Sequence, residues 1–313
     1  MKRVIIDCDP SADDALALML AAASPELSLE AVTAVCGVCD VRQSANNALK
    51  ILELCGCSEI PVAAGASQPL KRKLEFDGKY CGCDGLSETE LKPASSCLSE
   101  LPASELLHQR LEAHPGEIYI ISIAPMTNLA ELLMKYPQSR SQIAGIYTIN
   151  GSYGVASDKS CWNPRPSWNV RTDPEAAKLV IESGIPITAA GLDVTMQLKN
   201  HMTERILTEG NKESWAYRFL EKSVDFNRRR GLEPYSLLVD AMAAAAAVRP
   251  EIARYIQGKA AVSDQDGLMC GQTLFGVKGY ADAWNSDVRA ACSFDFDTYI
   301  DLFLDCLLYT SPS

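Results

Sequence analysis

Short apolar runs alternate with helix-like segments along most of this chain. Runs such as VIID (residues 4–7), IYIISIA (118–124) and ITAAGLDV (187–194) are mainly apolar, and segments with helical periodicity or many alanines lie between them. A strand is apolar at nearly every position when both of its faces are buried. The alternation of such strands with helices therefore predicts an α/β fold: a mostly parallel sheet with helices on both faces. Ligands bind such sheets at the carboxyl ends of the strands. We therefore expect the active site at the C-terminal ends of the strands.

The chain is expected to form one domain. No internal repeat and no Gly/Ser-rich linker divides its 313 residues, and a chain of this length buries a core without disulfide or metal support. We predict a single domain over residues 1–305 and set residues 306–313 aside as a non-native or truncated tail. Two irregular segments, 68–88 and 152–169, are long enough to border a pocket.

Charge and cysteine content restrict the partners. The formal net charge is −11, whereas a nucleic-acid polymer needs a basic surface, so we expect a small-molecule ligand. No apolar run reaches the roughly 18 residues of a membrane span, so no membrane partner is expected. The 12 cysteines are scattered, and the opening MKRVIID lacks the pattern of an export signal, which predicts reduced thiols in the cytoplasm. Cys36 and Cys39 have zinc-knuckle spacing, but without a nearby histidine we favour thiols over structural zinc.

Four aspartates crowd one predicted strand-to-helix junction. The stretch VIIDCDPSADDALALMLAA (residues 4–22) contains Asp7, Asp9, Asp13 and Asp14. Asp9 precedes a proline, which disfavours helix there, so the helix is expected to begin near Asp13 or Asp14. Capping of that helix would explain Asp13 and Asp14, but not Asp7 and Asp9, which precede it. Because clustered carboxylates repel and hard oxygen ligands suit Ca²⁺ or Mg²⁺, we predict a divalent cation at this junction.

Two enzyme families place acidic pairs at such a point. The D-x-D of Asp7 and Asp9 resembles the nucleophile motif of haloacid dehalogenase-type phosphatases, and we keep that activity as a less favoured alternative. The longer string D-x-D-P-x-x-D-D-A resembles the signature of the inosine-uridine-preferring nucleoside hydrolases. Further stretches resemble that family in order along the chain: TAVCG (33–37), IPVAAGASQPL (60–70), PMTNLA (125–130), WNVRTDPEAA (168–177), GLDVT (191–195) and VDA (239–241).

The resemblance implies hydrolysis of the N-glycosidic bond of purine or pyrimidine ribonucleosides to free base and ribose, in nucleoside salvage. It implies a Rossmann-like fold and a homodimer or homotetramer. It also implies a Ca²⁺ ion held by Asp9, Asp14, Asp240 and the main-chain carbonyl of Ile123. Asp9 would be the general base toward a Ca²⁺-bound water that attacks the anomeric carbon.

The remaining site residues follow from the same motifs. Asp13 and Asn169 are expected to hydrogen-bond the ribose hydroxyls, although Asn169 could instead cap the turn before the DPEAA segment. Asp7 is expected to support the site by orienting Asp9 or backbone amides. Asp240 lies within an apolar helix-like segment, LLVDAMAAAAA (237–247), where a buried carboxylate without a partner is costly, which favours a metal ligand.

Several positions depart from the family pattern. Val239 and Cys81 stand where the family often has histidine, and Val38 and Ser167 replace two further polar residues. The histidines of the chain, His108, His114 and His201, match no motif position. We expect substrate contacts from three further residues: Trp168 stacking on a base or filling the lid, Asn163 replacing contacts to the 5′ side, and Cys81 acting as an acid, a contact or simple packing. These departures leave open a second hypothesis, a catalytically weak ribosyl-binding or nucleoside-binding protein.

Overall fold

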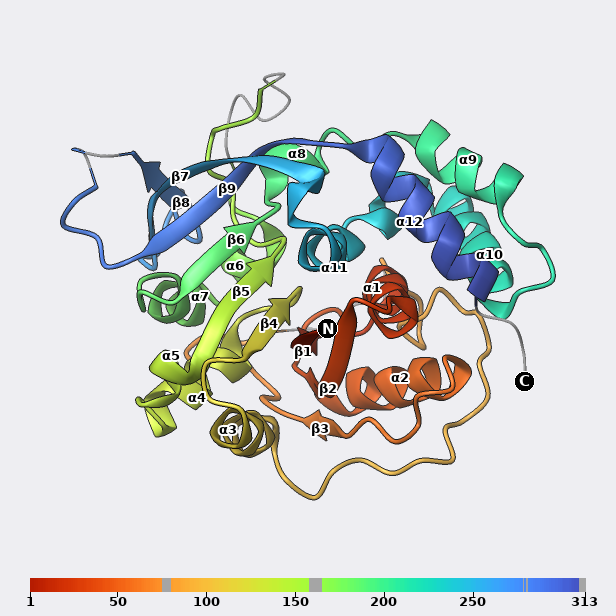
Figure 1. The fold of residues 1–313 in the computed structure, drawn as a ribbon, viewed down its shortest axis with the longest axis horizontal. Coiled ribbons are helices and arrows are strands. Elements are labelled where there is room, and N and C mark those ends of the chain that lie inside the picture. The colour runs from red at the N-terminus through yellow and green to blue at the C-terminus, as the bar shows by residue number, and fades with distance from the viewer. Residues whose placement is uncertain (75–79, 158–164, 278, 280, 310–313) are drawn as a thin grey trace.

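The computed structural model describes residues 1–74, 80–157, 165–277, 279 and 281–309. In these residues one sheet has the strand order β3-β2-β1-β4-β5-β6-β9-β7-β8 (Figure 1). Its strands are β1 (Lys2–Cys8), β2 (Leu27–Ala34), β3 (Val62–Ala64), β4 (Ile118–Ser122), β5 (Ile143–Thr148), β6 (Pro186–Ala189), β7 (Ala253–Val262), β8 (Thr273–Gly276) and β9 (Asp287–Phe294). Pairing is parallel from β3 through β9, and β7 and β8 add antiparallel pairs at one edge. The predicted α/β fold with a mostly parallel sheet is confirmed.

Helices cover both faces of this sheet (Figure 1). One face carries α3 (Ala103–Ala113), α4 (Thr127–Lys135), α5 (Ser139–Gln142), α6 (Trp168–Thr172) and α7 (Pro174–Ile181). The other carries α1 (Ala12–Ala23), α2 (Val41–Leu54), α8 (Leu192–Thr195), α9 (Asn200–Glu209), α10 (Trp215–Arg230), α11 (Ala241–Val248) and α12 (Phe296–Tyr309), with the short 3₁₀ helices η1 (Pro234–Leu238) and η2 (Pro250–Ile252) nearby. The domain boundary at residue 305 stays a prediction, and α12 extends beyond it.

The central strands are apolar because each face packs against a different core. In β1, Val4 and Ile6 pack with α1 and α11, whereas Ile5 packs with the cluster of α3, α4 and α7. All three side chains are completely buried. The alternation of a strand sends neighbouring residues to opposite faces, so two cores require apolar residues at successive positions.

One predicted strand is shorter than its apolar run. The run ITAAGLDV continues past Ala189, where β6 ends, and its second half forms α8. The carboxylate of Asp193 accepts the backbone N–H groups of Tyr153 at 2.7 Å and Val155 at 2.6 Å, which ties this turn to the loop after β5. These hydrogen bonds to a neighbouring loop end the strand, and the composition of the run alone does not show them.

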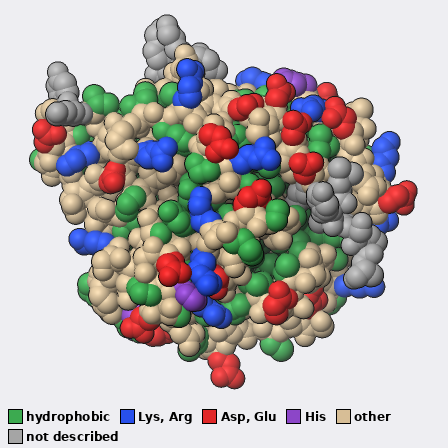
Figure 2. Space-filling view, in the orientation of Figure 1, with side chains coloured by type: hydrophobic (Ala, Val, Ile, Leu, Met, Phe, Trp, Pro, Cys, Tyr) green, Lys and Arg blue, Asp and Glu red, His purple; other side chains and the backbone are tan. Residues whose placement is uncertain are grey.

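The surface carries charges of both signs. On the face drawn in Figure 2, acidic and basic side chains are intermixed. That face therefore shows no continuous basic tract of the kind that binds a nucleic-acid polymer. Within the described part of the chain, no helix has the length and apolar character needed to cross a bilayer.

Candidate active site

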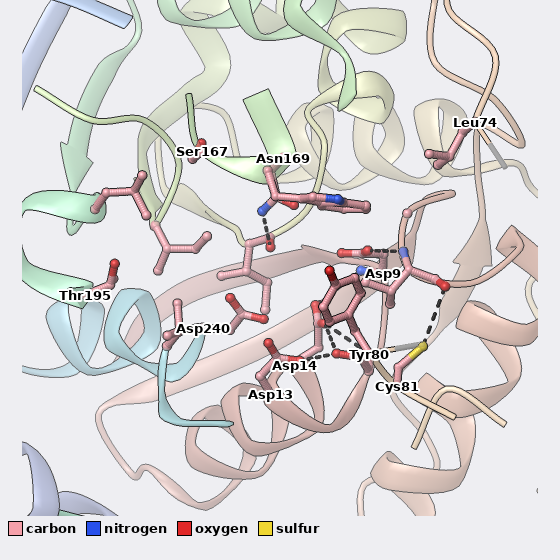
Figure 3. Close-up of a pocket in the computed structure, with 18 residues that line it drawn as sticks. Asp9, Asp13, Asp14, Leu74, Tyr80, Cys81, Ser167, Asn169, Thr195 and Asp240 are labelled. Carbon is pink, nitrogen blue, oxygen red and sulfur yellow. Dashed lines mark hydrogen bonds between the residues drawn. The ribbon is translucent and has the colours of Figure 1, made fainter. Parts of the chain in front are cut away.

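A cavity of about 420 Å³ opens at the C-terminal ends of the central strands. Asp9 follows β1, Gly37 and Val38 follow β2, Ile123 follows β4 and Ile149 follows β5. Helix N-termini and loops supply the other lining residues: Ser11, Asp13, Asp14, Leu74, Tyr80, Cys81, Ser167, Trp168, Asn169, Leu192, Thr195, Val239 and Asp240 (Figure 3). The cavity therefore lies at the C-terminal ends of the strands, where the strand pattern predicts a ligand site.

An acidic group occupies one wall of the cavity. Asp13, Asp14 and Asp240 each offer a carboxylate oxygen, and these oxygens lie within 4.8 Å of one another. Burial, followed by the charge of Asp13, raises the pKa of Asp14 to about 8. Burial and the charges of Asp13, Asp14 and Asp9 raise the pKa of Asp240 well above its ordinary value. The described residues that line the cavity include no Lys, Arg or His, so these carboxylates face one another without a basic side chain between them.

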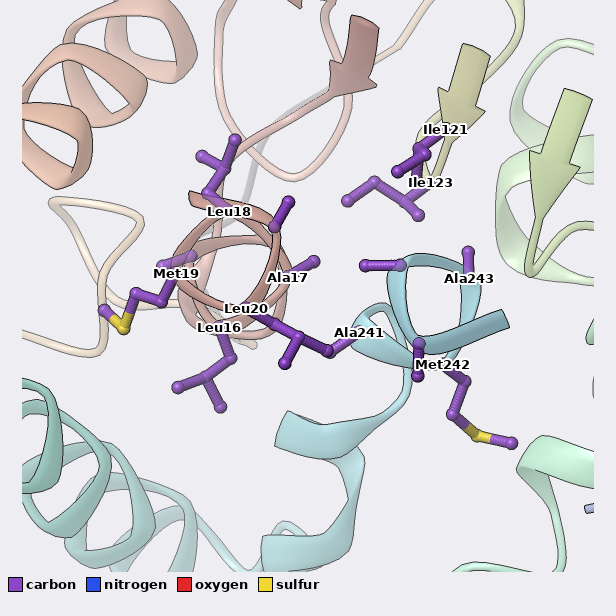
Figure 4. Packing of buried hydrophobic residues seen from close by; sticks show 14 of the residues in the cluster. Leu16, Ala17, Leu18, Met19, Leu20, Ile121, Ile123, Ala241, Met242 and Ala243 are labelled. Carbon is purple, nitrogen blue, oxygen red and sulfur yellow. The ribbon is translucent and has the colours of Figure 1, made fainter. Parts of the chain in front are cut away.

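Asp240 joins this group from a segment far from Asp13 and Asp14 in the sequence. It lies at the N-cap of α11 rather than inside a helix, which corrects the position expected from the apolar segment. The residues of α11 from Ala241 to Val248 are all buried, and the helix packs against α1, β4 and β5 (Figure 4). Small alanine side chains allow this close approach. The packing places the start of α11 beside the start of α1, which carries Asp13 and Asp14.

Asp9 lies beside the group of three carboxylates. Its backbone N–H donates to Oδ1 of Asp14 at 3.2 Å, and its Oδ2 accepts the N–H of Val38 at 2.7 Å. A Cβ added to Gly37 would lie 1.8 Å from the same Oδ2, so the carboxylate packs against backbone that only glycine can provide. Burial, followed by the charge of Asp14, raises the pKa of Asp9 well above its ordinary value.

Helix capping accounts for part of the geometry of Asp14. Ser11 is the N-cap of α1, and its N–H donates to Oδ2 of Asp14 at 3.1 Å. The Ser11 hydroxyl also hydrogen-bonds Asp13. A side chain at position 11 is therefore used to fix both acidic residues, and the positive end of the helix favours their charged forms.

Asn169 joins α6 to the ends of two strands. Its Nδ2 donates to the Ile123 carbonyl at 2.8 Å and to Oδ1 of Asn150 at 2.8 Å. The carbonyl has a second lone pair, so this bond leaves it able to accept a further ligand. Asp173 is the residue that caps α7, accepting the N–H of Ala176 at 3.0 Å. The capping interpretation of Asn169 is therefore wrong, and Asn169 faces the cavity.

Asp7 lies beneath the cavity rather than in its wall. Its Oδ1 accepts the Thr33 hydroxyl at 2.6 Å and Nδ2 of Asn128 at 2.8 Å. Asn128 in turn accepts the N–H of Ala66 at 2.9 Å. Burial raises the pKa of Asp7 to about 7. These bonds connect the ends of β1 and β2 with α4, so they support the floor of the site.

Apolar, aromatic and thiol side chains also line the cavity. Cys81 Sγ lies 3.6 Å from the Val38 carbonyl, and Tyr80 and Trp168 are 58% and 47% exposed at the mouth. Val239 also lines the cavity. Asn163 lies outside the described residues. The histidines are elsewhere: His108 lies within α3, His114 is the C-cap of α3, and His201 lies in α9.

Sequence reasoning missed Asn150 as part of the site. Asn150 is fully buried, holds Asn169 through Oδ1, and donates from Nδ2 to the Ala124 carbonyl at 3.0 Å. The available signal was its place directly after an apolar run, the same signal that marks Asp9. Thr195, the last residue of the GLDVT motif, also lines the cavity and was given no role.

Comparisons with known proteins place the chain in a family. A sequence profile described as inosine-uridine preferring nucleoside hydrolase matches residues 4–301. The chain belongs to this family. This assignment supports the resemblance of D-x-D-P-x-x-D-D-A to nucleoside hydrolases over the resemblance of D-x-D to haloacid dehalogenase-type phosphatases.

Similar proteins include enzymes with different base preferences. The pyrimidine-specific ribonucleoside hydrolase RihA of Citrobacter koseri is 39% identical over 210 residues, which span 66% of this chain and 66% of that relative. Among solved structures, the plant nucleoside hydrolase PpNRh1 gives a TM-score of 0.86 at 29% identity over 99% of both chains. A purine-preferring ribonucleoside hydrolase from Gardnerella vaginalis gives 0.85 at 26% identity, again over 99% of both chains.

Proposed function

We propose that this member of the nucleoside hydrolase family cleaves the N-glycosidic bond of ribonucleosides, releasing a free base and ribose. The observation that carries the proposal is the convergence of four residues from widely separated segments on one cavity: Asp9, Asp14, Asn169 and Asp240. Such a set combines acidic groups for a cation and a proton with an amide for a sugar hydroxyl. The named relatives, which are ribonucleoside hydrolases, support the same reaction.

A divalent cation fits the acidic group. The oxygens of Asp13, Asp14 and Asp240 are close together; burial raises the pKa of all three carboxyl groups, and the charges of neighbouring aspartates raise the pKa of Asp14 and Asp240 further. We propose Ca²⁺, which accepts several oxygen ligands in flexible geometry, with Asp9, Asp14, Asp240 and the Ile123 carbonyl as its protein ligands. When bound, the ion would align the ribose diol and make a coordinated water more acidic.

The protein side chains then divide the reaction between them. Asp13 and Asn169 would hydrogen-bond the ribose hydroxyls, and the bonds from Asn169 to Ile123 and Asn150 fix its amide in place. Asp9 would accept a proton from the attacking water as the bond between the anomeric carbon and the base nitrogen breaks. Positive charge develops on the sugar ring in such a transition state, and the neighbouring carboxylates stabilise it.

The base would lie against the apolar wall. Tyr80 and Trp168 are partly exposed aromatic residues that line the cavity, and Val239 and Cys81 also line it. Aromatic faces suit a planar base. We propose Trp168 and Cys81 as contacts to the substrate, together with Asn163 toward its 5′ side, and Asp7 as support for the floor through Asn128.

A ribosyl-binding protein with little turnover is the second candidate. It is favoured by Val239 and Cys81, because an aliphatic side chain cannot protonate a departing base and the Cys81 thiol already contacts the Val38 carbonyl. The metal and ribose side of the cavity would serve binding equally well. Measurements of binding and of turnover on the same protein separate the two candidates.

The test is release of ribose from a panel of inosine, uridine, cytidine, adenosine and nicotinamide riboside. We expect hydrolysis of at least one riboside with Ca²⁺, its loss with a calcium chelator, and its return when Ca²⁺ is restored. Calorimetry with the same ribosides provides the control. Calcium-dependent binding without ribose release from any of them would favour the binding protein and reject the hydrolase.

We further propose that the protein acts in the cytoplasm, in nucleoside salvage, as a homodimer or homotetramer. The scattered cysteines of the sequence support a reducing compartment. The assembly is proposed from the family alone. Light scattering of the purified protein measures it directly.

A further inference from the structure

Two thiols from separate segments meet at the cavity, one of them lining it. Cys39 lies in the loop between β2 and α2, and Cys81 lies in the loop that borders the cavity. Their Sγ atoms are 3.9 Å apart, and the two residues are only 7% and 4% exposed. The S–S bond of a disulfide is about 2.0 Å long, so the two sulfurs would have to approach each other by about 2 Å to form one.

The surrounding loop is anchored in a way that holds the thiols together. Nδ2 of Asn47 donates to the Pro10 carbonyl at 3.0 Å and to the Asp84 carbonyl at 2.9 Å. The Cys81 carbonyl accepts the N–H of Ser87 at 2.8 Å. Gly85 has a φ of +75°, and a Cβ there would lie 2.5 Å from Cys39 Sγ. Glycine at this position both permits the turn and leaves space for the thiol.

The thiol pair is connected to the proposed general base through one residue. Val38 precedes Cys39 in the chain, and its N–H donates to Oδ2 of Asp9 at 2.7 Å. Its carbonyl lies 3.6 Å from Cys81 Sγ (Figure 3). A movement that brings the two sulfurs together therefore also moves the backbone that positions the Asp9 carboxylate.

We propose that Cys39 and Cys81 are a redox modification site, which hydrogen peroxide converts into a reversible disulfide that disables the cavity. Cys81 lines the cavity, so a small peroxide reaches its sulfur from the substrate side. The Cys81 sulfur takes one oxygen to become a sulfenic acid, and water leaves. The Cys39 sulfur then displaces the hydroxyl as a second water and forms the S–S bond. A dithiol reductant returns both thiols. Cytosolic disulfides of this transient kind are typically redox-sensing.

The first measurement is the cross-link itself. The full-length protein is treated with hydrogen peroxide, its remaining thiols are alkylated, and its peptides are analysed by mass spectrometry without reduction. The hydrogen bond to Cys81 and burial raise the pKa of the Cys39 thiol, so mildly alkaline buffer is used to hasten the reaction. We expect a Cys39–Cys81 linked peptide that a dithiol removes. Oxidation of Cys81 to sulfinic acid without this cross-link would overturn the proposal.

Matched variants identify the pair. Cys39→Ser and, should that variant fold poorly, Cys39→Ala should lack the linked peptide. Cys97→Ser, at an exposed cysteine, should still form it. The oxidised wild type should also unfold at a higher temperature than the reduced protein, because a cross-link restricts the unfolded chain.

The effect on activity rests on the proposed function and is measured separately. Peroxide should lower riboside hydrolysis by the wild type at least about tenfold, with recovery in dithiol, and should leave Cys39→Ser active. Equal loss of activity in both would overturn the claim that this disulfide disables the cavity. If the reduced protein hydrolyses no riboside, the proposed function fails, while the cross-link experiment still decides whether the modification site exists.

Discussion

At the scale of single residues, the position of Asp9 differs from that of the other cavity carboxylates. It lies beside the three oxygens that group together, and its Oδ2 accepts the N–H of Val38 from the loop after β2, whereas Asp14 accepts the N–H groups of Asp9 and Ser11. A carboxylate held by one firm hydrogen bond has its second oxygen available for a proton. This geometry supports the proposal that Asp9 both binds the cation and accepts the proton of water.

The change Asp9→Asn tests the proposed role of Asp9 as the base. Asparagine keeps an oxygen for the Val38 N–H, so the fold should be retained, but it cannot accept a proton as a carboxylate does. We expect kcat to fall by about 10²–10⁴, the usual contribution of a general base. Steady-state kinetics of ribose release give the value. Asp225→Asn, an exposed substitution of the same kind on α10, should leave kcat within about twofold of wild type. An unchanged kcat in Asp9→Asn would reject Asp9 as the base.

At the scale of elements, α11 has one unusual requirement. It is buried along its whole length, yet its N-cap is an aspartate that must reach a polar cavity. Alanines satisfy the first condition because they let the helix lie close to α1 and the sheet. The position of Asp240 therefore depends on side chains that touch no ligand.

The change Ala244→Leu should disturb both the core and the site. Ala244 is completely buried, and adding methylene groups to a packed core costs about 1–3 kcal/mol of unfolding free energy. Displacement of α11 should also weaken Ca²⁺ binding, which calorimetry measures alongside chemical denaturation. Ala113→Leu, at the exposed end of α3, is the matched control and should change neither quantity appreciably. Full stability in Ala244→Leu would show that the space around α11 is looser than described.

Element boundaries show where sequence reasoning reached its limit. The apolar runs identified the parallel sheet because strands buried on both faces leave a local signature. The end of β6 depends on bonds from Asp193 to a loop forty positions away, and the start of α11 depends on contact with α1. Such contacts cannot be predicted from any short stretch of sequence. Asp9 follows an apolar run and Ile123 was proposed from the resemblance to the family, whereas the partnership of Asn150 with Asn169 required the folded chain.

At the scale of the whole molecule, the acidic group links stability to both pH and cation. The folded-state pKa of Asp14 is about 8, above the ordinary value near 3.8. Its contribution to stability is therefore complete below about pH 4 and is lost as pH rises through 8. A bound Ca²⁺ ion would supply the positive charge that protons supply at low pH.

Thermal unfolding with and without Ca²⁺ tests this linkage. We expect Ca²⁺ to raise the melting temperature more at pH 8 than at pH 6, because fewer protons compete for the carboxylates at the higher pH. Asp240→Asn should reduce this Ca²⁺-dependent rise in melting temperature at both pH values. A cation held by these side chains would be contradicted if Ca²⁺ raised the melting temperature equally at the two pH values. It would also be contradicted if Asp240→Asn left that rise unchanged.

The distance in sequence between Asp14 and Asp240 has a consequence for biosynthesis. A ribosome completes α1 early, but the carboxylate at the start of α11 is made only after most of the sheet, and it reaches α1 by packing against that sheet. An unfinished chain holds only part of the acidic group. Tight capture of the cation would therefore come after the central sheet is assembled, and a partly made protein would neither sequester the ion nor act on nucleosides.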